Sequence, residues 1–165
     1  WRVWLWQRYP AISRGYSIYN KLGLTTQISN IIQIGKNDVR PQFRRGRYTI
    51  MFIRQKNVIS KDNISLLQVL NTIRYIKKIP DASLLSSIER LLNIVKDLTS
   101  ADKKRMVGLL TKYPAGTRAL VGAMLEYLGN MELTEKLRNT LNPVTVYKMP
   151  GISKVIPKAT NWNIK

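Results

Sequence analysis

The chain contains no cysteine and no histidine among its 165 residues. Without cysteine there can be neither a disulfide nor a thiolate metal site. Without histidine the chain lacks the commonest general base and the commonest metal ligand. These two absences remove most hydrolase and metalloenzyme classes. The sequence therefore predicts no catalytic residue, no metal site and no cofactor.

Acidic residues are scarce as well: 9 Asp and Glu stand against 28 Lys and Arg, for a formal net charge of +19. An excess of one sign repels itself in the folded state unless a counter-charge lies nearby. A nucleic-acid backbone is the most abundant such counter-charge, and basic side chains bind it by displacing condensed counterions. The composition therefore predicts a nucleic-acid partner, without distinguishing RNA from DNA.

Long apolar runs are also missing, so the sequence predicts no membrane-spanning helix. The hydrophobic fraction of 44% is nevertheless enough for a core. Residues 1–61 carry 12 basic residues and one acidic residue. Residues 62–140 carry 12 basic and 8 acidic residues, and residues 141–165 carry 4 basic residues and no acidic one. We therefore expect three parts: a basic arm or subdomain over 1–61, a globular domain over 62–141, and an extended basic tail over 142–165.

The middle part is predicted to be helical, because its apolar residues recur at steps of three and four. The clearest amphipathic pattern runs from 84 to 98, and Asp81 or Ser83 can cap it. Thr99 can cap the next helix, and Thr117 the one after it. The predicted fold is mainly α, a bundle of four to five short helices over residues 62–141.

The helix expected over 117–128 is apolar nearly all round, which favours a central position in the bundle. Ala119, Gly122 and Ala123 form a strip of small residues on it. A glycine inside a helix costs roughly 1 kcal/mol relative to alanine. We therefore expect a close helix crossing at Gly122 that offsets this cost.

Outside the bundle the sequence predicts only a little β structure. Residues 48–53 alternate large apolar side chains in the manner of a strand buried on both faces. The isoleucine-rich run near residues 28–34 is apolar, but its pattern fixes neither helix nor strand. Residues 144–165 show no helical period, and we expect an extended arm that adds little to the core.

The densest basic cluster lies between residues 40 and 56, where Phe43 and Tyr48 are interleaved with arginines. The planar fork of arginine fits phosphate, and an aromatic ring offers a face to bases or sugars. A solvated loop, or a contact with an acidic protein partner, would explain the same cluster. The predicted nucleic-acid-binding residues are Arg40, Arg44, Arg45, Arg47, Arg54 and Lys56.

The first nine residues hold a second aromatic group, made of Trp1, Trp4, Trp6 and Tyr9. Such amphipathic rings favour interfaces and often serve as anchors in protein–protein contacts. We predict that they dock into a neighbouring subunit. Binding to a membrane surface, or folding back onto the chain's own core, are the alternatives.

Two weaker patterns have simpler explanations. The short turn before residue 117 suggests a helix-turn-helix, but residues 117–128 offer few polar side chains to read bases, so two adjacent bundle helices are favoured. Glu126, Glu132 and Glu135 are the only clustered carboxylates. Acidic side chains in the first turn of a helix interact favourably with the helix dipole. This explains Glu132 and Glu135 without a catalytic role.

Together these observations predict a non-enzymatic structural protein that binds nucleic acid and neighbouring subunits in a large assembly, with no small-molecule substrate. A viral capsid or core protein, located in the virion, fits best. A ribosomal protein that binds rRNA, of a mitochondrial or another ribosome, is the first alternative. A DNA-binding regulatory protein is the second, although it would need a polar recognition surface that the sequence does not display.

Overall fold

The computed structural model describes residues 11–165, so the four aromatic residues predicted to dock a partner lie outside the described part of the chain. The chain forms two compact units: the first runs to Thr72 and includes Ile79–Asp81, and the second comprises Ile73–Lys78 and Ala82–Lys165. The first unit is α/β and the second is helical. The predicted division at residues 61 and 141, which rests on charge, stays a prediction.

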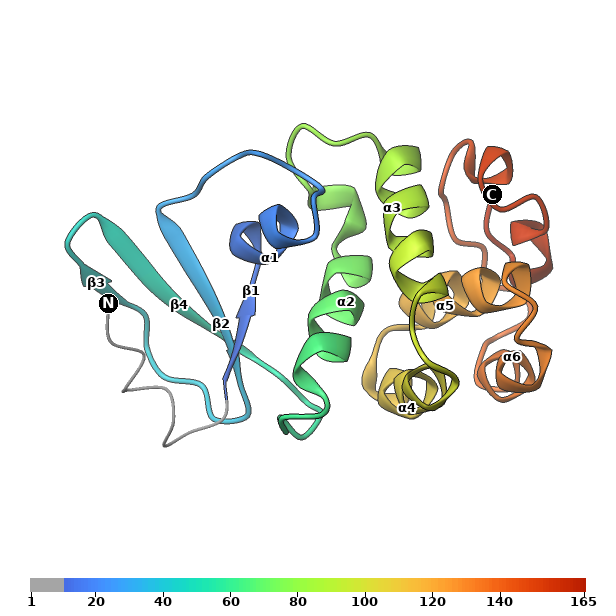
Figure 1. The fold of residues 1–165 in the computed structure, drawn as a ribbon, viewed down its shortest axis with the longest axis horizontal. Helices are drawn as coiled ribbons and strands as arrows, with labels where there is room; N and C mark the ends of the chain where they lie inside the picture. The colour runs from blue at the N-terminus through green and yellow to red at the C-terminus, as the bar shows by residue number, and fades with distance from the viewer. Residues whose placement is uncertain (1–10) are drawn as a thin grey trace. The chain divides into compact units, whose positions relative to one another are not determined.

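The expectation of a mainly α fold is wrong, because the first unit is built on a four-stranded mixed sheet (Figure 1). The strand order is β1-β2-β4-β3; β2 and β4 are parallel, and the two outer pairs are antiparallel. The strand predicted over 48–53 is present, and the isoleucine-rich run forms its parallel neighbour. The strands are β1 (Ile12–Arg14), β2 (Ile31–Lys36), β3 (Phe43–Arg45) and β4 (Tyr48–Arg54).

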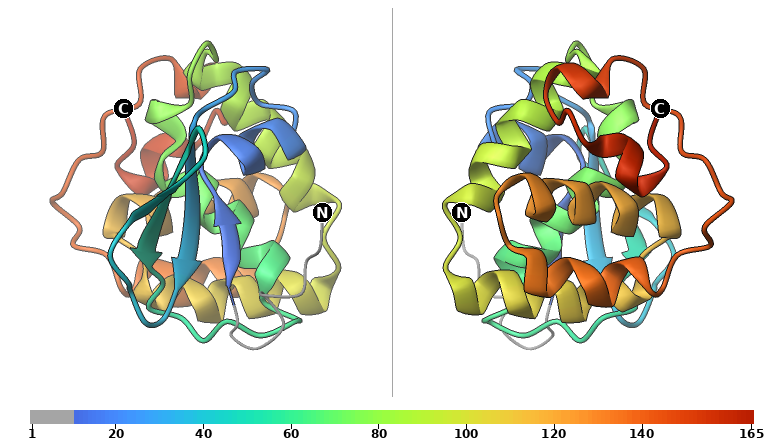
Figure 2. Two further views of the ribbon diagram at one scale, coloured as in Figure 1. Left: turned by 90° about the vertical axis from the view of Figure 1, so that its left-hand side faces the viewer. Right: turned by 90° about the vertical axis from the view of Figure 1, so that its right-hand side faces the viewer.

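Two helices, α1 (Tyr16–Lys21) and α2 (Ile64–Arg74), lie on one side of this sheet (Figures 1 and 2). The segment of α2 within the first unit buries Leu67 and Leu70 completely. Beyond the end of β4, Gln55 accepts a hydrogen bond of 3.1 Å from Asn71 of α2, and both side chains are buried. A buried amide pair of this kind is stable only because its polar atoms satisfy each other. The contact fixes α2 against the end of the sheet.

The second unit contains the later helices of the predicted bundle, whereas the first predicted helix, α2, lies mostly in the first unit. Ser83 caps the first of these later helices by accepting from the Ser86 N–H at 3.1 Å, and Thr99 caps the second by accepting from the Asp102 N–H at 3.1 Å. Both caps follow the preference for hydroxyl side chains at a helix start. The helices are α3 (Leu84–Lys96), α4 (Ser100–Leu109), α5 (Ala115–Tyr127) and α6 (Met131–Arg138).

Helix α5 begins two residues before the predicted cap at Thr117. The carbonyl oxygen of Pro114 accepts from the N–H groups of Thr117 and Arg118, at 3.0 and 3.1 Å, so Thr117 already lies in the first turn. Proline can stand at a helix start because its missing N–H would have had no intrahelical partner. The central position predicted for this helix is confirmed, since residues 119–125 are all buried.

The C-terminal segment is not an extended arm, which corrects a further part of the predicted fold. Short 3₁₀ turns at Ile152–Lys154 and Ala159–Trp162 fold it against α5 (Figure 2, right). Ile156, Trp162 and Ile164 are at most 2% exposed. A segment without a helical period can therefore still be tightly packed.

Trp162 also explains the small-residue strip on α5. A Cβ atom added at Gly122 would lie 2.3 Å from the Trp162 ring. The glycine therefore makes room for an indole from the C-terminal segment, and not for a crossing helix as the sequence suggested. The compensation for glycine in the helix comes from burying a large ring.

Candidate nucleic-acid interface

The predicted arginine cluster is centred on a hairpin formed by β3 and β4. Arg45 pairs with Tyr48, so the turn consists of Gly46 and Arg47 alone. Gly46 has a φ of +60°, whereas Arg47 keeps a negative φ. A two-residue turn with a positive φ only at its first position is the type II′ turn, in which glycine is favoured there. This geometry places arginines immediately before and after Gly46 at the hairpin tip.

Strand pairing then determines which side chains share a face. Successive side chains of a strand point to opposite faces, and paired residues point to the same one. Phe43 and Arg45 of β3 therefore share a face with Tyr48, Ile50 and Phe52 of β4. The Phe43 and Phe52 rings lie 6.1 Å apart between centroids.

The arginine of the turn is held against one of these rings. Arg47 donates a hydrogen bond of 2.8 Å to the Tyr48 hydroxyl, and its guanidinium carbon lies 5.0 Å from the ring centroid. Arg47 is nevertheless exposed, so part of its five-donor fork stays accessible. The contact orients a cation beside an aromatic ring.

An apolar groove of about 650 Å³ lies on the same face. Ile32 and Ile34 of β2 and Ile50 of β4 line it, together with Tyr48 and the turn. Phe43, next to this groove in the register, is 49% exposed. The surface thus combines an apolar floor, aromatic rings and cations. We name it the hairpin face, and it comprises Phe43, Arg45, Arg47, Tyr48 and the groove floor of Ile32, Ile34 and Ile50.

The structure brings only some of the six predicted binding residues together. Arg45 and Arg47 line the groove, and Arg54 lies farther along the same face of β4. Arg44 pairs with Thr49 and points to the opposite face. Arg40 precedes β3 and Lys56 follows β4, so both lie outside the hairpin. All six residues are exposed, and three of them, Arg44, Arg45 and Arg47, lie in the hairpin itself.

The charge of this surface is not neutralised from within. Asp38 is the only acid among residues 1–61. In the part of the chain that the structure describes, no ion pair engages Arg44, Arg45 or Arg54. Unpaired guanidinium groups beside exposed rings can bind phosphate and stack on a base at the same time.

Sequence reasoning missed the contribution of β2. Ile32 and Ile34 become part of the site only because β2 pairs with β4 in parallel register, with Ile32 opposite Ile50. A single sequence does not reveal which strands pair. The available signal was the alternation within residues 31–36, which places Ile32 and Ile34 on the same face.

Other candidate sites have structural explanations. Glu126 accepts from the Trp162 indole N–H at 2.8 Å and from Arg138 at 3.2 Å, so it serves to hold α5, α6 and the C-terminal segment together. Helix α5 is too buried to read bases, which agrees with the interpretation as two bundle helices. Among residues 11–165, no three Asp, Glu, His or Cys side chains lie close enough together to hold a metal ion. The helices described are all too short or too polar to cross a bilayer.

The chain was also compared with known proteins. No protein-family model, no curated protein and no solved structure matches it.

Proposed function

We propose that this protein is a non-enzymatic structural component of a nucleoprotein assembly and that its hairpin face binds single-stranded nucleic acid. The observation that carries the proposal is the placement of arginines, without ion-pair partners among the described residues, beside the exposed Phe43 ring, the half-buried Tyr48 ring and an apolar groove, all on one face of the sheet. Phosphates bind to Arg45 and Arg47. Unpaired bases stack on Phe43 and Tyr48.

A single strand fits this surface better than a duplex. Bases in a duplex are stacked on each other and are not available to protein rings, whereas unpaired bases can splay onto aromatic side chains. Reading a duplex through the major groove needs a helix or ribbon with polar side chains that reach base edges. The groove floor between the arginines is made of isoleucines, which suit the flat apolar face of a base.

For the assembly itself, we propose a viral capsid or core, with a ribosome as the alternative. The net charge of +19 exceeds what the hairpin alone contributes, which suits a chain surrounded by phosphate. The two assemblies differ in stoichiometry. Purification of the native particle should give many symmetric copies of this chain for a capsid or core, and one copy for a ribosome.

The binding proposal is tested by the salt dependence of affinity. Fluorescence anisotropy with a labelled single-stranded oligonucleotide of mixed sequence would be measured over a salt series for the wild type and for a triple variant, Arg44→Ala, Arg45→Ala and Arg47→Ala. Each lost phosphate contact lowers the log–log slope by about 0.7 for a single strand, so loss of the Arg45 and Arg47 contacts should flatten the slope by about 1.4.

A charge-matched control is available in α4. The triple variant Lys103→Ala, Lys104→Ala and Arg105→Ala removes the same number of charges from a helix of the second unit. It should leave the slope close to that of the wild type, because these residues lie outside the hairpin face. Equal flattening by both variants would mean that affinity follows net charge alone, and the hairpin face would lose its assigned role.

A further inference from the structure

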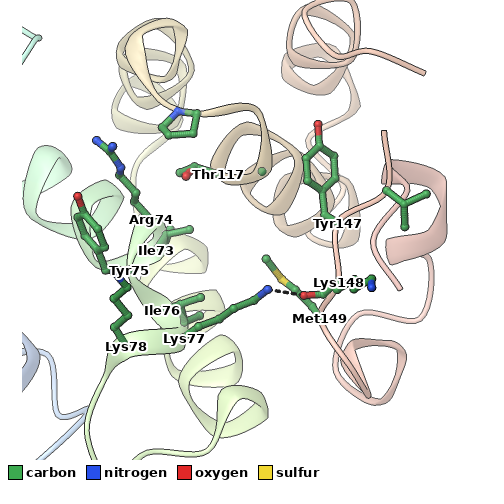
Figure 3. A pocket seen from close by; sticks show the side chains of 13 residues that line it. Ile73, Arg74, Tyr75, Ile76, Lys77, Lys78, Thr117, Tyr147, Lys148 and Met149 are labelled. Atoms are coloured by element: carbon green, nitrogen blue, oxygen red, sulfur yellow. Dashed lines mark hydrogen bonds between the residues drawn. The ribbon is translucent and has the colours of Figure 1, made fainter. Parts of the chain in front are cut away.

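A second basic pocket, of about 480 Å³, is lined only by residues of the second unit (Figure 3). Its walls come from three segments: residues 73–78, then Pro114, Gly116 and Thr117 at the start of α5, and residues 146–149 of the C-terminal segment. Four lining side chains are basic, namely Arg74, Lys77, Lys78 and Lys148. Of the described residues that line the pocket, none is acidic.

The start of α5 faces this pocket. The helix has 13 residues, and its N-cap, Pro114, makes no side-chain cap hydrogen bond. The Thr117 N–H is bonded to the Pro114 carbonyl, whereas the N–H groups of Ala115 and Gly116 have no partner among residues 11–165. These free donors stand at the positive end of the helix dipole, where an anion is stabilised.

A second and separate feature is the side chain of Thr117. The residue is only 6% exposed, yet its hydroxyl has no hydrogen-bond partner in the described chain. Figure 3 shows this hydroxyl pointing into the open space of the pocket, on the side of Arg74. A hydroxyl that has no protein partner and faces an open pocket is available to donate to a ligand and to accept from it. The hydroxyl of Tyr147, another lining residue, is likewise buried without a partner.

The basic side chains around the pocket are arranged without competing acids. Arg74 and Lys78 both lie over the Tyr75 ring, at 5.2 and 5.7 Å from its centroid. Lys77 donates to the backbone carbonyl of Lys148 across the pocket (Figure 3, dashed line). This bond joins two of the three walls. No ion pair within the described residues uses Arg74, Lys78 or Lys148.

We infer that this pocket binds a phosphate group, with the N–H group of Gly116 and the hydroxyl of Thr117 as donors and with Arg74 and Lys148 as flanking cations. Free backbone N–H groups, a hydroxyl and guanidinium or ammonium groups are the donors that phosphate accepts from. The volume exceeds that of a phosphate alone and falls in the range of small-molecule sites. The pocket can therefore hold a ligand larger than inorganic phosphate, which we take to be a nucleotide, either free or at the 5′ end of a strand. This site is separate from the hairpin face.

The test follows the backbone amide signals of Gly116 and Thr117 by NMR while AMP is added to the full-length chain. We expect saturable shifts at these amides with AMP, weaker ones with inorganic phosphate and none with adenosine. Thr117→Val keeps the shape of the side chain and removes the hydroxyl, and it should weaken AMP binding about tenfold, as should Lys148→Gln. The control Lys154→Gln, an exposed lysine outside the pocket, should leave binding unchanged.

A second arm identifies the source of the phosphate. Two oligonucleotides of one sequence, with a 5′-phosphate and with a 5′-hydroxyl, are titrated under the same conditions. Amide shifts with the 5′-phosphorylated strand but not with AMP assign the pocket to strand ends, and shifts with both assign it to nucleotides in general; either result supports the site. The inference fails if neither ligand shifts these amides, if adenosine binds as well as AMP, or if Lys154→Gln weakens binding as much as Lys148→Gln.

The same titration separates this site from the proposed function. The triple variant Arg44→Ala, Arg45→Ala and Arg47→Ala should retain the AMP shifts at Gly116 and Thr117, because the hairpin lies in the other unit. Loss of the AMP shifts in this variant would overturn the separate site. If this variant lost strand binding but kept the AMP shifts, the phosphate pocket would be confirmed as a site separate from the hairpin face.

Discussion

Gly122 shows how one residue in a helix can depend on a distant part of the chain. The sequence identified it as a position of close approach, but the neighbour is Trp162, and no pattern in the sequence names that partner. Helix caps depend on near neighbours instead, because Ser83 and Thr99 each accept a hydrogen bond from the residue three positions later in the chain. Local chemistry was therefore predictable at this scale, whereas long-range partners were not.

Gly122→Ala should destabilise the protein, by about 1–3 kcal/mol, because the added methyl group overlaps the Trp162 ring and forces it to move. Gly108→Ala is the matched control. It lies in α4 with no atom within 4 Å of an added Cβ, so it should stabilise by about 0.5–1 kcal/mol through helix propensity. Denaturant unfolding measures both changes, and two changes of the same sign would contradict the assigned packing.

Glu126 should matter for stability through its hydrogen bonds. Glu126→Ala leaves the buried Trp162 indole N–H and Arg138 without an acceptor and should cost about 1–3 kcal/mol. Glu126→Gln keeps one carbonyl acceptor for the indole and should cost less. Thermal unfolding of the two variants provides the comparison. If Glu126→Ala lowered the melting temperature no more than Glu126→Gln, the hydrogen bonds of Glu126 would not be holding these segments together.

Among the elements, long amphipathic helices were predictable and short strands were not. Helix α3 spans 13 residues, enough for several turns of apolar repeat. Strands β1 and β3 have three residues each, too few for alternation to be distinguished from chance. The sheet arises because these short segments pair with β2 and β4, and a pairing of distant segments leaves no periodic signal. This is why a four-stranded sheet was expected to be only a little β structure.

The hairpin turn offers a test of the β3–β4 element. Gly46→Val should destabilise the hairpin by about 1–2 kcal/mol, because a β-branched side chain resists the positive φ required there. Gly46→Asn should cost less, since asparagine tolerates this conformation. An added side chain meets no atom within 4 Å, so crowding plays no part. The NMR signals of paired residues Arg45 and Tyr48 report the hairpin, and equal loss in both variants would argue against the assigned turn.

For the whole molecule, the C-terminal segment changes what truncation should do. An extended arm could be removed without loss of stability, but this segment buries Ile156, Trp162 and Ile164. Deleting residues 144–165 should therefore lower the melting temperature markedly, since burial of a tryptophan alone is worth about 3–5 kcal/mol. Calorimetry checks the change, with Lys154→Ala plus Lys158→Ala as the surface control. An unchanged melting temperature after truncation would contradict this packing and would support the extended arm that the sequence predicted.

Charge at the scale of the whole chain is the sequence feature on which the proposed function rests, and it can be counted without knowing which strands pair. It indicated a phosphate-rich partner and a basic region between residues 40 and 56. The structure then added the apolar floor from β2 and placed Arg44 on the opposite face. Composition can thus suggest the class of partner, but the face that meets it is defined only when strands pair.

The most direct test of the central claim is photo-crosslinking of the chain to a single-stranded oligonucleotide, followed by mass spectrometry of the attached peptides. Binding at the hairpin face predicts crosslinks at Phe43 and Tyr48, whose rings would stack on bases. The crosslinks should decline as unlabelled strand competes. Crosslinks confined to the helices of the second unit, with none on residues 43–52, would contradict the account.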